Sequence, residues 1–281
     1  MLPMFQTTCH NTAEQVIDCF EPISLQEMDN VSLLNRTDTK FVLNTNQLWH
    51  ILTQINDHYR VLTINQRRIN SYQTLYFDTP NFMLYMQHHN GQRGRYKVRC
   101  RKYVDTNVCY LEVKLKTNKD NTVKNRLRIP EIITVLEEDT RNFMRDHFPF
   151  ESQLLKPKSR NNFERITLVS RRNVERLTID LNLNFKRDGA GTLLPGIVIA
   201  EVKQERFSLN SDFMQQMRAM HLYSTGFSKY CIGTAILYPH LKRNRFKPIL
   251  ILINKLCGLF NPSTPHTDRK PQIPTKLGGD L

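Results

Sequence analysis

Hydrophobic and polar side chains alternate along seven segments of the chain, a pattern typical of strands with one apolar and one polar face. These segments are 36–43, 72–78, 93–101, 109–116, 124–128, 177–183 and 197–203, and the short stretch 165–168 adds an eighth. Apolar residues spaced three and four positions apart predict helices over 45–55, 136–148 and 212–217, with Asn44 and Ser211 suited to cap the first and last. These apolar stripes are expected to pack against the sheet.

The most strongly charged face belongs to the segment 93–101. Every second residue of this segment is basic, and we call these residues the basic row: Arg93, Arg95, Lys97, Arg99 and Arg101. Neighbours in the row would be about 6.6 Å apart on one face of a strand. An ordinary outer face of a sheet mixes cations with acids, whereas these cations repel one another unless an anion lies along them. An extended phosphate chain matches both the charge and the repeat of the row.

The positive charge of the chain is focused on the same region. The formal net charge is +14, and residues 93–128 carry twelve basic and three acidic side chains. Such a focus favours a polyanionic partner, which could be a nucleotide, polyphosphate, nucleic acid or an anionic membrane surface. An RNA-binding sheet would interleave aromatic residues with the cations, but Tyr96 falls on the face opposite the basic row. We therefore expect no nucleic-acid partner.

The alternation is compatible with two architectures. A closed antiparallel barrel would turn the charged faces inward and cover its apolar outside with helices. An open sheet would instead present the basic face to solvent or to a partner. Periodicity alone does not separate the two, although 281 residues with 40% hydrophobic side chains are sufficient for a large core.

Six segments resemble, in order, the motifs of the VTC domain, the polyphosphate polymerase domain of the vacuolar transporter chaperone complex. They read LLNRTDTKFVL, TLYFDTPNFMLYMQHHNGQRGRYKVRCRKY, YLEVKLKTNKDNTVKNRLRI, ERLTIDLNLNF, IAEVKQE and FSKYC. The chain looks like a free-standing bacterial member of this group, which belongs to the CYTH-like triphosphate tunnel metalloenzymes. The resemblance implies an α+β fold in which an eight-stranded antiparallel β-barrel forms a tunnel and helices pack outside. The tunnel domain would cover 31–247, after an N-terminal segment 1–30. Composition adds a short apolar helix over 248–260 and a Pro-rich tail, 261–281, which has little to pack and is expected to be disordered.

The same resemblance assigns roles to individual residues. The catalytic cations would be Arg99, Arg101, Lys114, Arg165, Arg176 and Lys229. Further phosphate-binding residues would be Arg36, Lys40, Lys97, Lys124, Arg126, Lys203 and Ser228, and Glu201 would bind a divalent metal, Mn²⁺ or Mg²⁺. The alternative for Glu201 is an ion pair with Lys203 or another cation of the tunnel. Asp38 and Asp180 are expected to orient arginines. Glu112 is a weaker candidate metal ligand, for which a structural ion pair is at least as good an interpretation.

The resemblance predicts a metal-dependent transfer of the γ-phosphate of ATP to a growing inorganic polyphosphate chain. A tunnel hydrolase of triphosphate or polyphosphate and a non-catalytic polyphosphate or nucleotide binder are the alternatives. The first strand reads R-T-D-T-K where the hydrolases and cyclases of the superfamily carry E-x-E-x-K. The missing carboxylates would help to bind a second metal, so their loss favours the polymerase.

The remaining features concern location. Six cysteines at 9, 19, 100, 109, 231 and 257 form no C-x-x-C pair, and we interpret them as reduced thiols. The N-terminus lacks the pattern of a signal peptide, so a cytoplasmic protein is expected. The most apolar stretch, 249–260, is too short to span a bilayer, and a helix packed on its own domain is the favoured interpretation. A peripheral membrane or membrane-protein partner at this stretch stays open.

Overall fold

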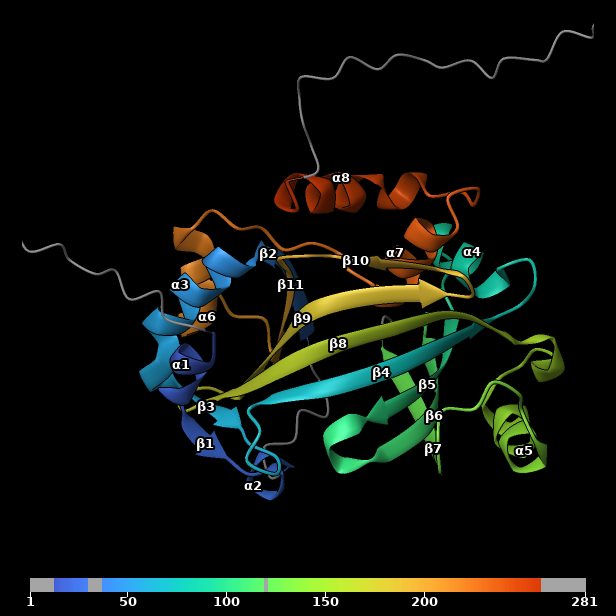
Figure 1. Ribbon diagram of the computed structural model, residues 1–281, viewed down its shortest axis with the longest axis horizontal. Coiled ribbons are helices and arrows are strands. Elements are labelled where there is room, and N and C mark those ends of the chain that lie inside the picture. Colours follow the sequence, from blue (N-terminus) through green and yellow to red (C-terminus); the bar gives the residue numbers. More distant parts are fainter. Residues whose placement is uncertain (1–12, 30–36, 119–120, 259–281) are drawn as a thin grey trace, which may run out of the picture.

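The computed structural model describes residues 13–29, 37–118 and 121–258. Eight antiparallel strands form the main sheet (Figure 1), in the order β2 (Thr37–Asn44), β11 (Ile197–Gln204), β9 (Glu175–Arg187), β8 (Lys156–Ser170), β4 (Ile69–Asp78), β5 (Arg95–Tyr103), β6 (Val108–Lys116) and β7 (Thr122–Ile129). The predicted α+β class with eight antiparallel strands is confirmed. Within the described residues the end strands β2 and β7 do not pair with each other, so the sheet curls without closing.

Three short strands were not predicted. They are β1 (Glu21–Ile23), β3 (Tyr59–Leu62) and β10 (Ala190–Leu193), and β1 pairs with β3 in parallel. One predicted position was wrong, because β5 begins at Arg95 and Arg93 lies in the exposed turn before it. Of the five residues of the basic row, only the four from Arg95 to Arg101 therefore lie on strand β5.

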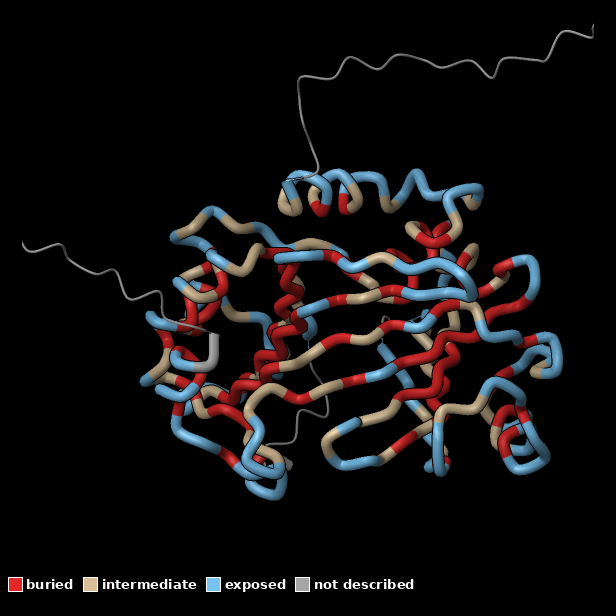
Figure 2. Tube along the Cα trace, in the orientation of Figure 1, coloured by how far each residue is buried: buried red, intermediate tan, exposed pale blue. Residues whose placement is uncertain are grey.

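Helices cover the apolar outer face of the sheet, as the alternation predicts. One group consists of α1 (Ala13–Asp18), α3 (Thr45–Ile55) and α6 (Asp212–Ala219), whose apolar side chains share a core with β2, β11, β9 and β8. A second core lies between the strands β4 to β7 and α5 (Glu138–His147). Figure 2 shows buried segments along the strands and on the helix sides that meet them.

The predicted helix caps are present. The side chain of Asn44 accepts a hydrogen bond from the backbone N–H of Gln47 at 2.8 Å, and the Gln47 side chain accepts one from the N–H of Asn44 at 2.9 Å. This reciprocal pair satisfies donors that the first turn of α3 leaves free. Ser211 likewise caps α6 through the N–H of Met214. Local sequence is thus sufficient to begin both helices.

Two further helices, α7 (Lys229–Leu237) and α8 (Lys247–Leu256), lie toward the inner side of the sheet. Helix α4 (Met83–His89) joins both sides, because its Leu84 packs in the outer core with α5 and its Tyr85 packs with Tyr230 of α7. Helix α7 is buried on nearly all sides, and its Ile232 packs with Val42 and Ile199, which lie on the inner faces of β2 and β11. Before this helix, the N–H of Thr225 donates to the carbonyl of Lys40 along the free edge of β2. Helix α7 therefore fills one end of the curled sheet.

Helix α8 corresponds to the predicted apolar helix. It buries Ile249 and Ile253 against the inner core, while Ile251 remains 46% exposed. None of the helices in the described ranges is long and apolar enough to cross a membrane. The tail predicted to be disordered, 261–281, lies outside the described residues.

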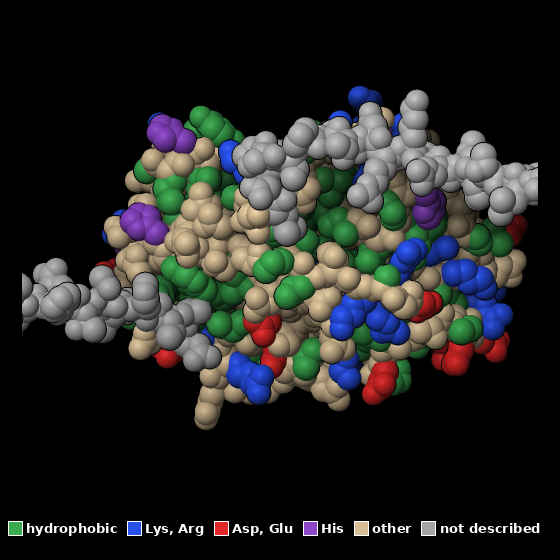
Figure 3. All heavy atoms as spheres, turned by 45° about the horizontal axis from the view of Figure 1, so that its top comes forward, with side chains coloured by type: hydrophobic (Ala, Val, Ile, Leu, Met, Phe, Trp, Pro, Cys, Tyr) green, Lys and Arg blue, Asp and Glu red, His purple; other side chains and the backbone are tan. Residues whose placement is uncertain are grey.

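The remaining elements are short: α2 (Leu25–Asp29) and the 3₁₀ turns Asn56–His58, Val104–Thr106, Ser152–Leu154 and Asn244–Phe246. Figure 3 shows the face that carries α8, where lysines and arginines lie beside acidic and apolar side chains. Such a mixture is typical of a solvated surface.

Candidate functional site

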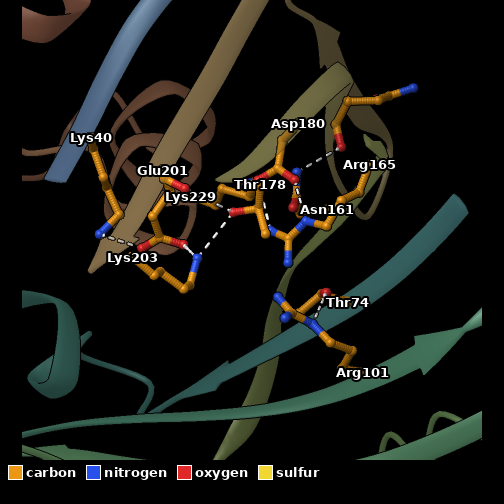
Figure 4. A network of polar contacts seen from close by, with 11 residues as sticks. Lys40, Thr74, Arg101, Asn161, Arg165, Thr178, Asp180, Glu201, Lys203 and Lys229 are labelled. Carbon is orange, nitrogen blue, oxygen red and sulfur yellow. Dashed lines mark hydrogen bonds and ion pairs between the residues drawn. The ribbon is translucent and has the colours of Figure 1, made fainter. Parts of the chain in front are cut away.

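The polar inner face of the eight strands, closed at one end by α7, forms the space that we call the bore. Side chains from β2, β11, β9, β8, β4 and β5 point into it and toward one another (Figure 4). The bore and its rim bring together these predicted residues: Lys40, Lys97, Arg99, Arg101, Lys114, Lys124, Arg126, Arg165, Arg176, Glu201, Lys203, Ser228 and Lys229. The remaining one, Arg36, lies outside the described residues.

Glu201 lies at the centre of the first cluster. Its two carboxylate oxygens contact Lys40 Nζ at 2.8 Å and Lys203 Nζ at 2.5 Å, and Lys203 also donates to the Thr178 hydroxyl at 3.0 Å. Burial opposes ionisation of Glu201, but the charges of Lys203 and Lys40 outweigh it and hold the pKa of Glu201 well below its ordinary value. Glu201 is therefore an anion held between two cations from neighbouring strands.

Asp180 organises the second cluster. It accepts two hydrogen bonds from Arg165, 2.6 Å from Nε and 2.9 Å from Nη2, and it also pairs with Lys229 at the start of α7. Burial opposes its ionisation, yet Arg165 and Lys229 lower the pKa of Asp180 to about 2. This pairing fixes the guanidinium plane of Arg165 and draws the N-terminus of α7 toward the bore.

Glu112 forms the third cluster and is completely buried. Its oxygens contact Arg99 Nη2 at 2.5 Å and Lys124 Nζ at 2.8 Å, and Arg99 Nε also donates to it at 2.6 Å. Burial opposes ionisation here too, but Arg99 and the neighbouring cations keep the pKa of Glu112 low. These contacts support the structural ion-pair interpretation of Glu112 over the metal-ligand one.

Several cations in the bore have no carboxylate within ion-pair distance among the described residues. Arg101 donates to the Thr74 hydroxyl at 3.3 Å, and Lys97 donates to the Ser228 hydroxyl at 3.1 Å. Lys114 lies close to the guanidinium of Arg99, whose charge, together with burial, holds the pKa of Lys114 well below its ordinary value. The bore thus carries more basic side chains than carboxylates, and an anionic ligand would stabilise their charged forms.

The N-terminus of α7 adds to this positive field. Ser228 is the cap of this helix, since its hydroxyl accepts from the N–H of Cys231 at 3.3 Å. The positive end of the helix dipole therefore faces the same space as Lys97 and Lys229. A buried hydrogen bond from the Tyr230 hydroxyl to the Asp78 carboxylate attaches the first turn of α7 to the end of β4.

The prediction from sequence missed four aromatic rings on the inner face. Tyr72 stacks on Phe163 with ring centroids 5.1 Å apart, and Tyr103 meets Tyr72 edge to face, also at 5.1 Å. Tyr110 follows Tyr103 at 6.2 Å. Within the basic row the face carries no aromatic residue, but the same face of β5 continues beyond Arg101 to Tyr103. Tyr103 has the parity of the row, and continuing the alternation by two residues would have found it.

The fit of a divalent metal depends on Glu201. Among the described residues no three His, Cys, Asp or Glu side chains cluster as a metal site. Mg²⁺ and Mn²⁺ are nevertheless often held by one carboxylate together with water and substrate phosphates. Both oxygens of Glu201 contact lysines, Lys40 and Lys203, so a metal would have to displace one of these cations. Glu201 can serve in this way if that exchange occurs and phosphate oxygens supply most of the other ligands. The residues fit a metal that arrives with its substrate, and they do not fit a cage made by the protein alone.

The class of protein now follows from sequence and fold together. The sequence model of the VTC domain matches residues 35–238, so the chain belongs to the VTC domain family. No curated protein matches the chain significantly. The resemblance inferred from the motifs is confirmed.

Solved structures with a similar arrangement share little sequence identity with this chain. One is a candidate adenylate cyclase from Bacillus halodurans, with a TM-score of 0.45 and 11% identity over 69% of this chain and 94% of that chain. Another is a candidate adenylyl cyclase from Hippeastrum, described as having a dominant triphosphatase activity, with a TM-score of 0.44 and 11% identity over 71% and 96%. A protein from Pyrococcus horikoshii has a TM-score of 0.40 and 10% identity over 72% and 98%.

Proposed function

We propose that this protein is a polyphosphate polymerase, which transfers the γ-phosphate of ATP to the end of an inorganic polyphosphate chain within the bore. The observation that supports this most directly is the excess of basic side chains over carboxylates in the bore. Three of these basic side chains, Lys97, Arg101 and Lys114, have no carboxylate within ion-pair distance among the described residues. A condensed phosphate chain carries charge at regular intervals and would neutralise all three.

The proposed reaction is an in-line displacement. A terminal oxygen of the bound polyphosphate attacks the γ-phosphorus of ATP, the bond from that phosphorus to the β-bridging oxygen breaks, and ADP leaves. The attacking oxygen is already ionised, so no strong general base is needed. The work of the site is to align the two phosphates and to stabilise the charge that spreads over the transferred group.

Each cluster has a part in this proposal. Arg165, oriented by Asp180, offers planar donors to non-bridging oxygens, and Lys229 adds a charge from the N-terminus of α7 beside the same carboxylate. Arg99 and Arg101 would line the path of the chain from β5. Mg²⁺ or Mn²⁺ bound by Glu201 would supply further positive charge to the phosphate oxygens when present.

The test is to follow ATP by ³¹P NMR in the presence of Mg²⁺ or Mn²⁺ and a short polyphosphate primer. We expect internal phosphate resonances to grow as ADP appears, and Arg165→Ala to abolish this growth. Orthophosphate as the only new product would instead identify a tunnel hydrolase. Binding of ATP and polyphosphate without turnover would leave a binding protein.

A further inference from the structure

The N-terminus of α7 is attached to three different strands by three consecutive residues. The Ser228 hydroxyl accepts a hydrogen bond from Lys97 of β5 at 3.1 Å, Lys229 pairs with Asp180 of β9, and the Tyr230 hydroxyl donates to Asp78 at the end of β4. In the order of the sheet these strands belong to the run β9, β8, β4 and β5. The N-terminus of α7 therefore lies across four neighbouring strands.

The three contacts differ in how they respond to a phosphate ligand. Lys97 and Lys229 are cations of the bore, and under the proposed function both would turn toward phosphate oxygens. Their contacts with Ser228 and Asp180 would then weaken. Tyr230 is 2% exposed and Asp78 is 0% exposed, so neither side chain can reach a ligand. Their hydrogen bond is the one of the three that contains no phosphate-binding group.

The carboxyl group of Asp78 is held by neutral donors. Its Oδ1 accepts from the backbone N–H groups of Thr79 at 2.7 Å and Leu84 at 2.8 Å. Its Oδ2 accepts from the N–H of Tyr85 at 2.9 Å and from the Tyr230 hydroxyl. No cation of the described residues lies within ion-pair distance of it. A buried carboxyl group without a cation depends on each of these hydrogen bonds.

The backbone between β4 and α4 is strained at the residue before the helix. Phe82 has φ +58° and ψ +41°, in the left-handed region that residues with a side chain seldom adopt. Such a conformation persists only where surrounding contacts impose it. The bonds from Asp78 to Thr79 and Leu84 enclose this residue and fix the start of α4. Asp78 is therefore a rigid point, to which Tyr230 attaches α7.

We propose that Tyr230 and Asp78 are positioning residues, whose hydrogen bond keeps the N-terminus of α7 at the bore while Lys229 and Lys97 exchange their protein partners for phosphate oxygens. This inference rests on the proposed function only in that a condensed phosphate binds in the bore. In the free protein all three contacts hold the N-terminus of α7. In the complex the bond from Tyr230 to Asp78 holds it, and the apparent affinity falls with the fraction of molecules in which α7 keeps its place.

The test removes the hydroxyl of Tyr230 and asks whether the effect passes through Lys229. Binding of inorganic tripolyphosphate is measured by isothermal titration calorimetry for the wild type, Tyr230→Phe, Lys229→Met and the double variant. Phenylalanine keeps the ring, which packs on Tyr76 with centroids 5.1 Å apart. Tyr238→Phe is the matched control, because the Tyr238 hydroxyl donates to the carbonyl of Lys158 at 2.7 Å at the opposite end of α7. Urea unfolding measures the stability of each variant.

We expect Tyr230→Phe to weaken tripolyphosphate binding at least about fivefold, within the range of coupling between residues of one network. In the Lys229→Met background the same change should weaken it less than about twofold, because the side chain that Tyr230 positions is already absent. Tyr238→Phe should leave the affinity unchanged even if it loses as much stability. An equal loss in both backgrounds would assign Tyr230 a general structural role and overturn the proposal, as would unchanged binding by Tyr230→Phe.

Hydrogen exchange of the wild type decides the question if Tyr230→Phe does not fold. The N–H of Cys231 donates to the Ser228 hydroxyl at 3.3 Å, and the N–H of Ile232 donates to the Ser228 carbonyl at 2.8 Å. We expect both amides to stay protected when tripolyphosphate saturates the protein, because Tyr230 still holds the first turn of α7. Faster exchange of these amides in the complex would show that the first turn loosens, and the proposal would be wrong.

The same measurements separate failure of this inference from failure of the proposed function. Tripolyphosphate binding with the expected coupling, but without phosphate transfer in the ³¹P assay, would uphold the positioning role and reject the polymerase. Chain growth without the coupling would reject the positioning role and uphold the polymerase. Binding of neither tripolyphosphate nor ATP by the wild type would overturn both.

Discussion

Replacing Glu112 by glutamine is the sharpest test of how the bore is held together. Glu112 is 0% exposed and keeps the cations Arg99 and Lys124 at 2.5 and 2.8 Å. The glutamine side chain has the same shape but no charge, and its amide nitrogen would face one of the two cations. Removing one partner of a buried ion pair costs about 3–5 kcal/mol, so we expect the free energy of unfolding of Glu112→Gln to fall by about that amount.

The measurement is urea unfolding at low ionic strength, with and without tripolyphosphate. A bound phosphate chain supplies the negative charge that the variant lacks, so the variant should bind tripolyphosphate more tightly than the wild type and its stability deficit should shrink as the ligand saturates. At a ligand concentration of 100 times Kd, binding alone adds about 2.7 kcal/mol. Glu164→Gln is the control. The side chain of Glu164 accepts from Asn182 at 2.7 Å and has no cation within ion-pair distance in the described part of the chain, so this change should alter stability by less than about 0.5 kcal/mol.

The reasoning fails if Glu112→Gln is as stable as the wild type without phosphate. In that case the repulsion between the cations of β5 and β7 would cost no measurable stability when no carboxylate lies between them. The excess of positive charge in the bore would then be no argument for a polyanionic ligand.

Three further predictions address catalysis, packing and pH. Glu201→Gln should lower phosphate transfer at least about tenfold in the ³¹P assay while Glu164→Gln retains full activity, and equal rates would remove Glu201 from the site. Gly233→Ala should lower stability in urea by about 1–3 kcal/mol, because a Cβ there would lie 2.5 Å from the Phe185 ring, and an unchanged midpoint would contradict this packing. Burial, aided by the charge of Lys97, lowers the pKa of His88 to about 2. Below pH 6.5 the imidazole therefore takes up a proton only in the unfolded chain, so the free energy of unfolding falls by up to about 1.4 kcal/mol per pH unit as the pH drops. His88→Gln should be less sensitive to acid over that range, and an identical pH profile would refute the assignment.

Much of the sheet and of the site was predictable because strand geometry is local. Alternation requires that Lys97, Arg99 and Arg101 share a face, whatever the strand pairs with. The caps at Asn44 and Ser211 are equally local, and both are present. Family motifs then identified the matching cations on distant strands.

The pairing of charges was only partly predictable in this way. The sequence predicts that Asp180 orients an arginine, but it does not say that this arginine is Arg165. Nor does it say that Lys229, which comes from a helix and not from the sheet, pairs with the same carboxylate. The same holds for the open edge between β2 and β7 and for the filling of one end by α7. These features depend on the curvature of the sheet and on contacts between residues far apart in the chain.

The sequence by itself determined which side chains share a face, because a strand has a period of two and a helix a period near 3.6. Only the tertiary structure decided that the charged faces meet around one space, in which Glu201, Asp180 and Glu112 each pair with at least one cation from another element. It also decided that the rings of Phe163, Tyr72, Tyr103 and Tyr110 form one ladder. The physical reason is that alternation fixes the face toward which each side chain of a strand points. The distance between side chains on different strands depends instead on the order in which the strands pair and on the curvature of the sheet.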